Sequence, residues 1–327
     1  MSLPIKYELI KRLSAANGDP ISGQQLADDL NISRTAIWKH MKQLEEEGYK
    51  FESIRKKGYM MLSAPDTLDP AKITAALETE QFGKKIIYEK TLSSTQTTAH
   101  QQAQDGAPNG TVVICEEQTE GRGRLTRPWK SQSGKGIAMS IILRPNVPPY
   151  EAPQFTLVGA VAVTCAIRDV AGIRPDIKWP NDLLINGLKC TGILTEMQAD
   201  PDRVNAIIMG IGINVNHDSQ DFDVDIANIA TSLKITIGKQ IDRAELVAKI
   251  LYYLEKFSNQ YIAEGFTNIK ALWEEYSCTI GSRIKATTLR DVFVGKAIGI
   301  TNEGILKLQL DDGTIKEIYS ADIELEK

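Results

Sequence analysis

The feature that most constrains the fold is a proline-punctuated segment, SAPDTLDPAK at residues 63–72, where the hydrophobic pattern changes. Short helix-like stretches and a basic ribbon precede it, and long apolar strands and helices follow it. A chain of 327 residues is too long for one small core. Near residue 276 the pattern changes again, to short strands and turns. We therefore expect three domains, at residues 1–65, 66–275 and 276–327.

The first domain carries the pattern of a helix-turn-helix. Ser22, with Gln25 three residues on, resembles a capping box, and Ser33 can cap a second helix after the turn NIS. Apolar residues in that second helix fall on one stripe, and the opposite face is polar and basic. This arrangement presents the second helix to a DNA major groove. The motif runs from Ser22 to Met41, and the candidate DNA contacts are Arg34, Thr35, Lys39 and Lys42.

A basic ribbon follows the two helices. The stretch YKFESIRKKGYMMLSAP predicts two short strands around Arg55, Lys56 and Lys57. Two helices with a basic wing form a winged-helix module, whose cations would hold phosphates. Residues 1–65 carry ten Lys/Arg against eight Asp/Glu, a net of +2, whereas the remainder carries 28 against 34, a net of −6. The alternative is a small helical bundle with a solvated basic face.

The remaining chain mixes strands and helices and ends in strands. Helices are expected at residues 71–82, 94–105, 154–172 and 242–265, and strands at 84–92, 110–118, 136–145, 176–197 and 204–216. After residue 276, turn signals at Asn302-Glu303-Gly304 and Asp311-Asp312-Gly313 mark hairpins. That tail suits a small barrel of SH3-like size.

Composition favours an ordinary globular protein. Hydrophobic residues make up 42% and charged residues 24%. We find no apolar run of the roughly 18 residues that a membrane span needs, and no signal-peptide core. The cysteines are far apart and the three histidines lack metal-ligand spacing, so reduced thiols in the cytoplasm, with no membrane partner, are expected.

Cations and glycines alternate in EEQTEGRGRLTRPWKSQSGKG, residues 116–136. Glycine lets a backbone approach a ligand closely, and arginine forks grip phosphate or carboxylate. Nucleic-acid binding and simple flexibility are the alternatives. The loop follows a strand in an acidic domain, no aromatic residue alternates with its arginines, and the Walker A pattern is absent. A grip for a small anion is therefore favoured.

Two later segments add to this prediction. KWPNDLLINGLKCTG brings cations, an amide and a carboxylate onto a strand–turn–strand unit, which suits a nucleotide with Mg²⁺, although an ordinary hairpin would look the same. In MGIGINVN, Gly210 and Gly212 alternate on a buried strand. They would clear one face for a flat ligand or a close neighbour.

In this order the motifs resemble the biotin–protein ligase family: S-T-Q, then Gln118 with GRGR, then KWPND, Lys189 and G-x-G-x-N. With the winged helix, the chain resembles the bifunctional form that is also the biotin-operon repressor. The resemblance runs from about Ile21 through the C-terminal strands. It implies an α+β fold with an N-terminal winged helix-turn-helix, a mixed α/β ligase domain of the class II synthetase-like type and a C-terminal SH3-like β-barrel.

The resemblance also implies a reaction. The biotin carboxylate attacks the α-phosphorus of ATP, with Mg²⁺ as cofactor, to give biotinyl-5′-AMP. A lysine of the biotin carboxyl carrier protein of acetyl-CoA carboxylase, or of another biotin-dependent carboxylase, then takes the biotin. The adenylate-bound homodimer would bind operator DNA and repress biotin genes.

Matched motif by motif, the resemblance assigns roles to particular residues. Lys189, Arg124 and Arg122 would be catalytic. Biotin would contact Ser94, Thr95, Gln96, Gln118, Arg122, Gly123, Arg124 and Lys189. ATP and Mg²⁺ would meet Lys178, Asn181, Asp182 and Asn214, with Asp182 on the metal. The plainer alternatives are Ser94 as a helix cap and Asn214 as a turn residue.

Two departures from the family pattern matter. Where some members read G-R-G-R-R-G-R, Leu125 and Thr126 stand here, so the loop should be less mobile and less cationic. No tryptophan lies between Asn214 and Ala271, so no adenine-stacking residue can be named. The glycine-rich loop is expected to order only when ligand contacts offset the entropy cost. A repressor that senses biotin without catalysis, and a lipoate ligase, are the competing interpretations.

Overall fold

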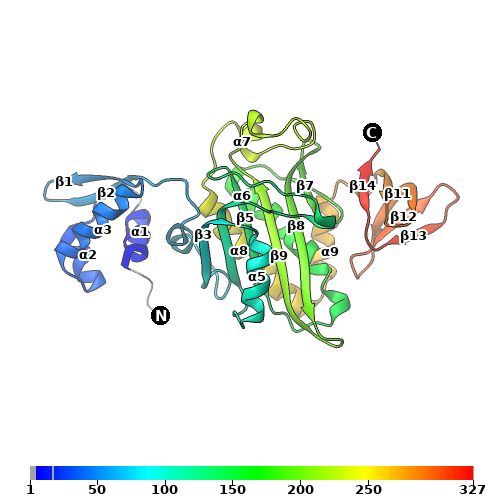
Figure 1. The fold of residues 1–327 in the computed structure, drawn as a ribbon, viewed down its shortest axis with the longest axis horizontal. Helices are drawn as coiled ribbons and strands as arrows, with labels where there is room; N and C mark the ends of the chain where they lie inside the picture. The colour runs from blue at the N-terminus through cyan, green and yellow to red at the C-terminus, as the bar shows by residue number, and fades with distance from the viewer. Residues whose placement is uncertain (1–4, 17, 327) are drawn as a thin grey trace.

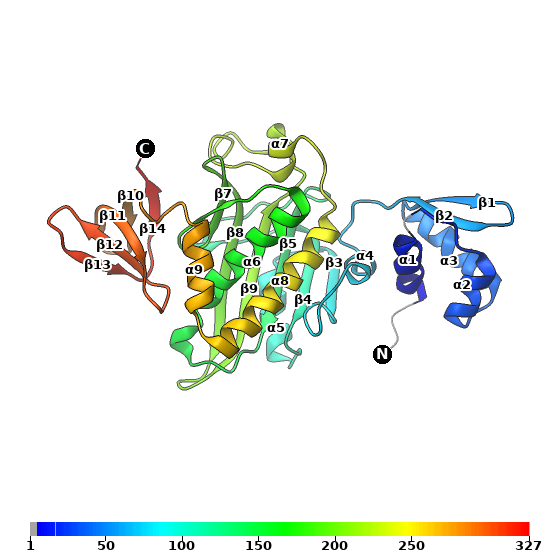
Figure 2. The same ribbon diagram turned by 180° about the vertical axis from the view of Figure 1, so that it is seen from behind.

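Three bodies lie in a row along the molecule (Figure 1). The computed structural model describes residues 5–16 and 18–326. A small helical module lies at one end, a large mixed domain in the middle and a small sheet at the other end, and the reverse view agrees (Figure 2). The two views thus show three bodies in the same order along the chain.

The N-terminal body is the predicted winged helix. Its elements are α1 (Ile5–Ala15), α2 (Gly23–Leu30), α3 (Arg34–Glu46), β1 (Lys50–Ile54) and β2 (Gly58–Ser63). Ser22 accepts a hydrogen bond from the Gln25 N–H and Ser33 from the Ala36 N–H, so both predicted N-caps are confirmed. The apolar stripe of α3, formed by Ile37, Met41 and Leu44, is buried.

The polar face of α3 is free, as predicted. Arg34, Thr35, Lys39 and Lys42 are exposed, and Arg55, Lys56 and Lys57 are exposed at the turn between β1 and β2. One further exposed side chain on this helix was not predicted: the Trp38 ring is 48% exposed and lies under the Lys42 ammonium.

The central body is a seven-stranded sheet covered on both faces. The strand order is β3-β4-β5-β9-β8-β7-β6; β3 pairs in parallel with β4, and every other pairing is antiparallel. Figure 1 shows α5 on one face, and Figure 2 shows α6, α8 and α9 on the other. The bounds are β3 (Ile86–Leu92), α5 (Thr95–Gln104), β4 (Thr111–Gln118), β5 (Gly136–Leu143), α6 (Gln154–Ala171), β6 (Asp176–Lys178), β7 (Asp182–Ile185), β8 (Leu188–Ala199), β9 (Val204–Asn214), α8 (Arg243–Glu264) and α9 (Thr267–Tyr276).

Helix α6 corrects one expectation from the sequence. With the turn before it, the helical stretch Pro149–Ala171 is long and apolar enough to cross a membrane by length and composition. The statement that no apolar run reaches that length is therefore wrong. Within the domain, 78% of this window is buried, so its apolar surface is covered by the sheet and by α8 and α9.

Helix α4 (Pro70–Ala75) is shorter than the predicted helix over residues 71–82. The N–H groups of Glu80 and Gln81 donate to the Glu255 carboxylate on α8, at 2.8 and 2.7 Å. The Glu255 carboxylate thus accepts hydrogen bonds from N–H groups that, in a longer helix, would donate to backbone carbonyls of the same helix. The short helix α7 (Leu233–Ile237) and α9 were not predicted.

The C-terminal body is one antiparallel sheet of five strands, in the order β13-β12-β11-β10-β14. Both predicted turns lie between its strands, the first joining β11 to β12 and the second β12 to β13. Trp179 Nε1 donates to the Gly304 carbonyl at 3.2 Å, which ties this sheet to the central body. The bounds are β10 (Arg283–Thr287), β11 (Val292–Ile300), β12 (Leu306–Leu310), β13 (Ile315–Ile318) and β14 (Asp322–Leu325).

Candidate active site

A cavity opens over the middle strands of the central sheet, between the start of α5 and the C-terminal sheet. It encloses about 750 Å³ of space, part of it open to solvent. Almost all the residues predicted for biotin and nucleotide line it: Ser94, Thr95, Gln96, Gln118, Arg122, Gly123, Arg124, Asn181, Asp182 and Lys189. Residues from five separate segments of the sequence therefore meet at one place.

One end of the cavity is a network of uncharged polar side chains. Gln118 Oε1 accepts from the Thr95 N–H at 2.8 Å and from its hydroxyl at 3.1 Å. The Ser140 hydroxyl lies 2.9 Å from the Thr95 hydroxyl and donates to Gln96 Oε1 at 3.0 Å. These groups hold one another in place, so this end is formed before any ligand arrives. Ser140, on β5, was not predicted.

Ser94 is the exception in this network. It occupies the N-cap position of α5 but makes no side-chain capping bond. Its hydroxyl is buried and has no hydrogen-bond partner among the described residues. Because buried polar groups are nearly always bonded, a hydroxyl of this kind that lines a cavity is available to bond a ligand or water. The structure therefore does not give Ser94 the helix-cap role.

Arg122 lies across this end of the cavity and is held by an acidic residue. Its Nη2 is 3.3 Å from Glu196 Oε2, which also accepts from Gln96 Nε2 at 2.9 Å and lies 2.9 Å from His100 Nε2. Burial alone would raise the pKa of Glu196, but these hydrogen bonds and the charge of Arg122 outweigh burial and lower it. Glu196, on β8, was not predicted; no motif marks it.

The segment between β4 and β5, residues 119–135, covers the other end; we call it the strap. Arg124 donates to Asn181 Oδ1 at 3.1 Å and to Ser320 Oγ at 2.8 Å, and Arg127 pairs with Asp322. Burial is the main cause that lowers the pKa of Arg124, against the pull of nearby carboxylates. Arg124 and Arg127 therefore reach the C-terminal body, whereas Arg122 does not.

The strap has an unusual backbone where it departs from the family pattern. Leu125 and Thr126 have φ values of 54° and 59°, in the left-handed region. Such a conformation disfavours a side chain with a Cβ, and a β-branched one most of all. The strap thus adopts a conformation that its own residues resist.

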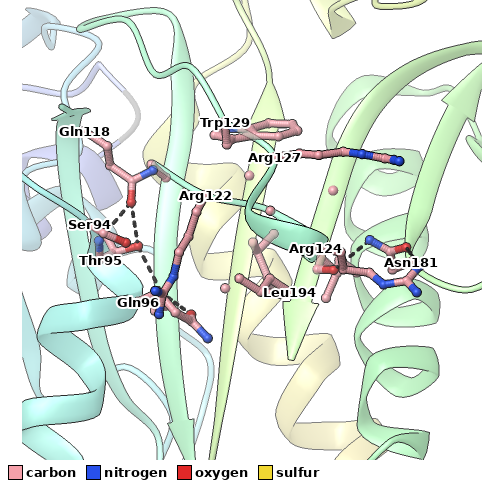
Figure 3. A pocket seen from close by; sticks show the side chains of 18 of the residues that line it. Ser94, Thr95, Gln96, Gln118, Arg122, Arg124, Arg127, Trp129, Asn181 and Leu194 are labelled. Carbon is pink, nitrogen blue, oxygen red and sulfur yellow. Dashed lines mark hydrogen bonds between the residues drawn. The ribbon is translucent and has the colours of Figure 1, made fainter. Parts of the chain in front are cut away.

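Trp129 is the aromatic residue that the sequence analysis missed. A Cβ on Gly212 would meet its ring at 2.4 Å, and one on Gly192 would meet it at 3.1 Å. The two glycines therefore clear space for a close neighbour, which was one of the two predicted uses of Gly212. The Lys189 ammonium lies 5.8 Å from the ring centroid. Figure 3 shows the indole above the cavity, with the polar end and Arg122 on one side and Arg124 and Arg127 on the other.

Lys189 and Asp182 face each other in the cavity wall, with Nζ 2.6 Å from Oδ1. Among the described residues, no group of three or more His, Cys, Asp or Glu side chains could hold a metal alone. Mg²⁺ usually takes one or two carboxylates with substrate phosphates. Asp182 therefore fits a Mg²⁺ that arrives with a nucleotide, and does not fit a resident ion.

Two predicted residues lie outside the cavity lining. Lys178 is on β6, paired across the hairpin with Asp182. Asn214 lines a smaller hollow behind Trp129, with Glu116 and His217. Burial, above all, lowers the pKa of His217 to about 4, so its ring is neutral at pH 7.

Comparisons with known proteins agree with this geometry. Three family models match: HTH domain over residues 6–60, Biotin/lipoate A/B protein ligase family over residues 88–214, and Biotin protein ligase C terminal domain over residues 279–326. The three matched ranges fall in the three bodies of the fold.

Individual proteins resemble the chain over most of its length. The bifunctional ligase/repressor BirA of Bacillus spizizenii is 51% identical, over 99% of this chain and all of its own. The biotin–[acetyl-CoA-carboxylase] ligase of Paracoccus denitrificans is 31% identical, over 62% of this chain and 86% of its own. The structure of biotin protein ligase from Aquifex aeolicus with biotin and ATP superposes with a TM-score of 0.65 and 30% identity, over 75% of this chain and 99% of that chain. The chain belongs to the family of bifunctional biotin protein ligases and repressors.

Proposed function

We propose that this chain activates biotin with ATP to biotinyl-5′-AMP and transfers the biotin to a lysine of a carrier protein. We propose further that the adenylate-bound form is the state that represses transcription. The family assignment supports a biotin ligase with a DNA-binding module.

The observation that carries the proposal is the division of the cavity into two ends: a neutral end, where the one cation, Arg122, is paired with Glu196, and a cationic end that gathers Arg124 and Lys189. Ser94, Thr95, Gln96 and Gln118 gather on one side, and Arg124 with Asn181 on the other (Figure 3). Biotin has the same division, a ureido ring at one end and a carboxylate at the other. The free Ser94 hydroxyl would bond the ring, and Arg124 and Lys189 would receive the acid.

In the first step, a biotin carboxylate oxygen bonds to the α-phosphorus of ATP, and the bond from that phosphorus to the bridging oxygen of pyrophosphate breaks. No proton moves. Lys189 and Arg124 would stabilise the negative charge that develops on the α-phosphate, since cations in a partly closed site are effective there. Mg²⁺, held by Asp182 and the phosphates, would supply charge neutralisation.

The purine would lie on Trp129. Among the described residues that line the cavity, this is the only aromatic one, and its ring adjoins Lys189. An indole offers a flat apolar surface for a base. Asn214, in the hollow behind the ring, would lie on the nucleotide side of the site.

In the second step, the neutral amine of a carrier lysine attacks the acyl carbon of the adenylate. The bond from that carbon to the phosphate oxygen breaks, AMP leaves, and the amine gives up one proton. The name of the Paracoccus denitrificans relative supports the carrier domain of acetyl-CoA carboxylase as acceptor, with other biotin-dependent carboxylases as further candidates. ATP, carrier and operator would all be met in the cytoplasm.

The winged helix would bind operator DNA as part of a homodimer. Arg34, Thr35, Lys39 and Lys42 lie exposed on α3, and the wing tip adds three cations. A two-fold dimer would present two such surfaces to a two-fold operator. Selection from a random duplex library, with and without biotin plus ATP, tests this part. Equal recovery in both arms would contradict it.

The enzymatic proposal is tested by biotin-dependent exchange of labelled pyrophosphate into ATP, followed by transfer of labelled biotin to a purified carrier domain. Exchange and transfer are both expected. A protein that only senses biotin would give neither, and a lipoate ligase would exchange with lipoate in preference to biotin.

A further inference from the structure

A fully buried arginine holds the segment that joins the winged helix to the ligase domain. Arg243, the first residue of α8, has no exposed side-chain surface. Its Nε lies 3.1 Å from Asp66 Oδ2, and its Nη2 donates to the Asp66 carbonyl at 2.7 Å. Its Nη1 donates to Glu116 Oε2 at 2.8 Å and to the Gly136 carbonyl at 2.9 Å. A buried guanidinium needs such a full set of acceptors.

The partners of Arg243 close the base of the strap. Glu116 lies on β4, just before the strap begins, and Gly136 is the first residue of β5, just after it ends. The Glu116 carboxylate also accepts from the Gly134 N–H at 3.4 Å, within the strap itself. Both ends of the strap therefore meet at the same ion pair.

The same ion pair holds the interdomain segment. Glu116 Oε1 accepts from the Leu68 N–H at 2.7 Å, so the carboxylate joins the strap base to residues after the linker proline. Asp66 Oδ2 accepts a further bond from Asn216 Nδ2 at 2.9 Å. Asn216 follows β9 by two residues, next to the hollow behind Trp129.

From this point the chain runs directly into the core of the winged helix. Ala71, on α4, is buried in one cluster with Ile10 of α1 and Leu44 of α3. Lys6 of α1 lies 3.3 Å from Asp69 at the start of α4. Helix α4 thus packs into the DNA-binding body, while the residues just before it are tied to the strap base.

We propose that Arg243, Glu116 and Asp66 form a coupling site that transmits ordering of the strap to residues 64–75 and so to the winged helix. Arg243 is a positioning residue, because it acts through Glu116 and Gly136, which line the smaller hollow behind Trp129 and lie outside the lining of the main cavity. This inference deepens the proposed function and depends on it: the ligand that orders the strap would be the adenylate.

Hydrogen–deuterium exchange of the full chain, with and without biotin plus ATP, tests the coupling. In the wild-type protein we expect exchange to slow both in the strap and in residues 64–75, by about fivefold or more. Asp66→Asn keeps the shape of the side chain but turns an amide toward the guanidinium. In this variant we expect ligand to slow hydrogen exchange in the strap as before, but no longer to slow it in residues 64–75.

The matched control is Glu78→Gln, which removes another carboxylate that pairs with α8, through Lys249, on an exposed surface. It should behave as wild type. Arg243→Lys, which keeps the charge without the fork, should lose the coupling as Asp66→Asn does, while both variants keep biotin-dependent pyrophosphate exchange.

Three results would overturn the inference. Residues 64–75 of the wild type could exchange equally fast with and without ligand while pyrophosphate exchange is intact. Asp66→Asn could behave as wild type in both segments. Asp66→Asn could also lose pyrophosphate exchange together with the ligand-dependent slowing of hydrogen exchange in both segments. Asp66 would then be a residue that supports the active site. Absence of biotin-dependent exchange in the wild type would instead overturn the proposed function itself, and the coupling with it.

Discussion

At the neutral end of the cavity the polar side chains are bonded to one another within a single domain, whereas at the cationic end they are bonded across a domain boundary. Thr95 and Ser140 share hydrogen bonds above the central sheet. Arg124 and Arg127 instead reach Ser320 and Asp322 of the C-terminal sheet. The first arrangement needs no change to accept a ligand. The second must exchange protein partners for the ligand anion.

This difference predicts a division of labour. Groups that are already in place contribute binding energy to substrate and transition state alike, which lowers KM. Cations that stabilise the charge developing on the α-phosphate more strongly than they bind the carboxylate of the substrate raise kcat. Substitutions at the neutral end should therefore act mainly on KM for biotin, and substitutions at the cationic end mainly on kcat.

The largest effect should come from the cationic end. Lys189→Ala and Arg124→Ala should each lower kcat for pyrophosphate exchange by about 10²–10³, the usual cost of removing one donor from a developing oxyanion. Lys178→Ala is the matched control, because Lys178 lies on the same hairpin outside the cavity lining. An equal loss of kcat in all three variants would contradict the predicted division between the two ends of the cavity. It would also indicate that Lys178 acts in the nucleotide site.

The next effect separates two serines at the neutral end. Ser140→Ala leaves Gln96 Oε1 without its donor, so unfolding free energy should fall by about 1–3 kcal/mol and KM for biotin should rise. Ser94→Ala removes a buried hydroxyl that has no partner. It should leave the melting temperature unchanged or raise it, while KM for biotin still rises. A lower melting temperature for Ser94→Ala would show that the hydroxyl bonds within the protein.

The same contrast explains how far the sequence could lead. The caps of Ser22 and Ser33 are bonds to residues three positions along the chain, so local pattern alone predicts them. The strap arginines and Lys189 belong to motifs of fixed spacing, and the structure brings them together. Helix α4 ends at Ala75, and the N–H groups of Glu80 and Gln81, which were predicted to be helical, are instead bound by Glu255, about 175 residues away. No local rule contains that information.

The same cause explains why some residues of the site were not predicted from the sequence. Ser140 and Glu196 lie on strands whose apolar neighbours dominate the pattern, and only strand pairing aligns them with Gln96. Trp129 did carry a signal. It follows the arginines directly, and Gly212 indicated that some flat group needed space. The family pattern indicates an aromatic residue after Asn214, whereas the ring over this cavity belongs to the strap.

Low pH should reduce the contribution that the Glu196 carboxylate at the neutral end makes to the stability of the folded protein. The pKa of this carboxyl is lowered from its ordinary value of 4.5 in the folded protein. Its contribution to stability is therefore fully present above the unfolded value and is lost as pH falls through the lower folded value. Against Glu196→Gln, wild type should melt higher at pH 7, and the difference should shrink only below about pH 4.5. The side chain is about a third exposed, so the difference should be modest. A gap that persists at the lowest pH would show that charge is not its source.

The smallest effect tests how firmly the strap is held in its closed form. Thr126 is β-branched and lies in the left-handed region, which costs a residue with a Cβ about 1–2 kcal/mol. Thr126→Asn should recover part of this cost, because asparagine tolerates that conformation. After dilution, release of biotinyl-5′-AMP should slow a few-fold. The KM for biotin, which depends on the neutral end, should not change. Leu125→Asn is the companion variant with a similar φ and without β-branching, and it should slow release less. Faster release from Thr126→Asn would mean that the strap leaves this conformation when ligand binds, and the cationic end would then close in another way.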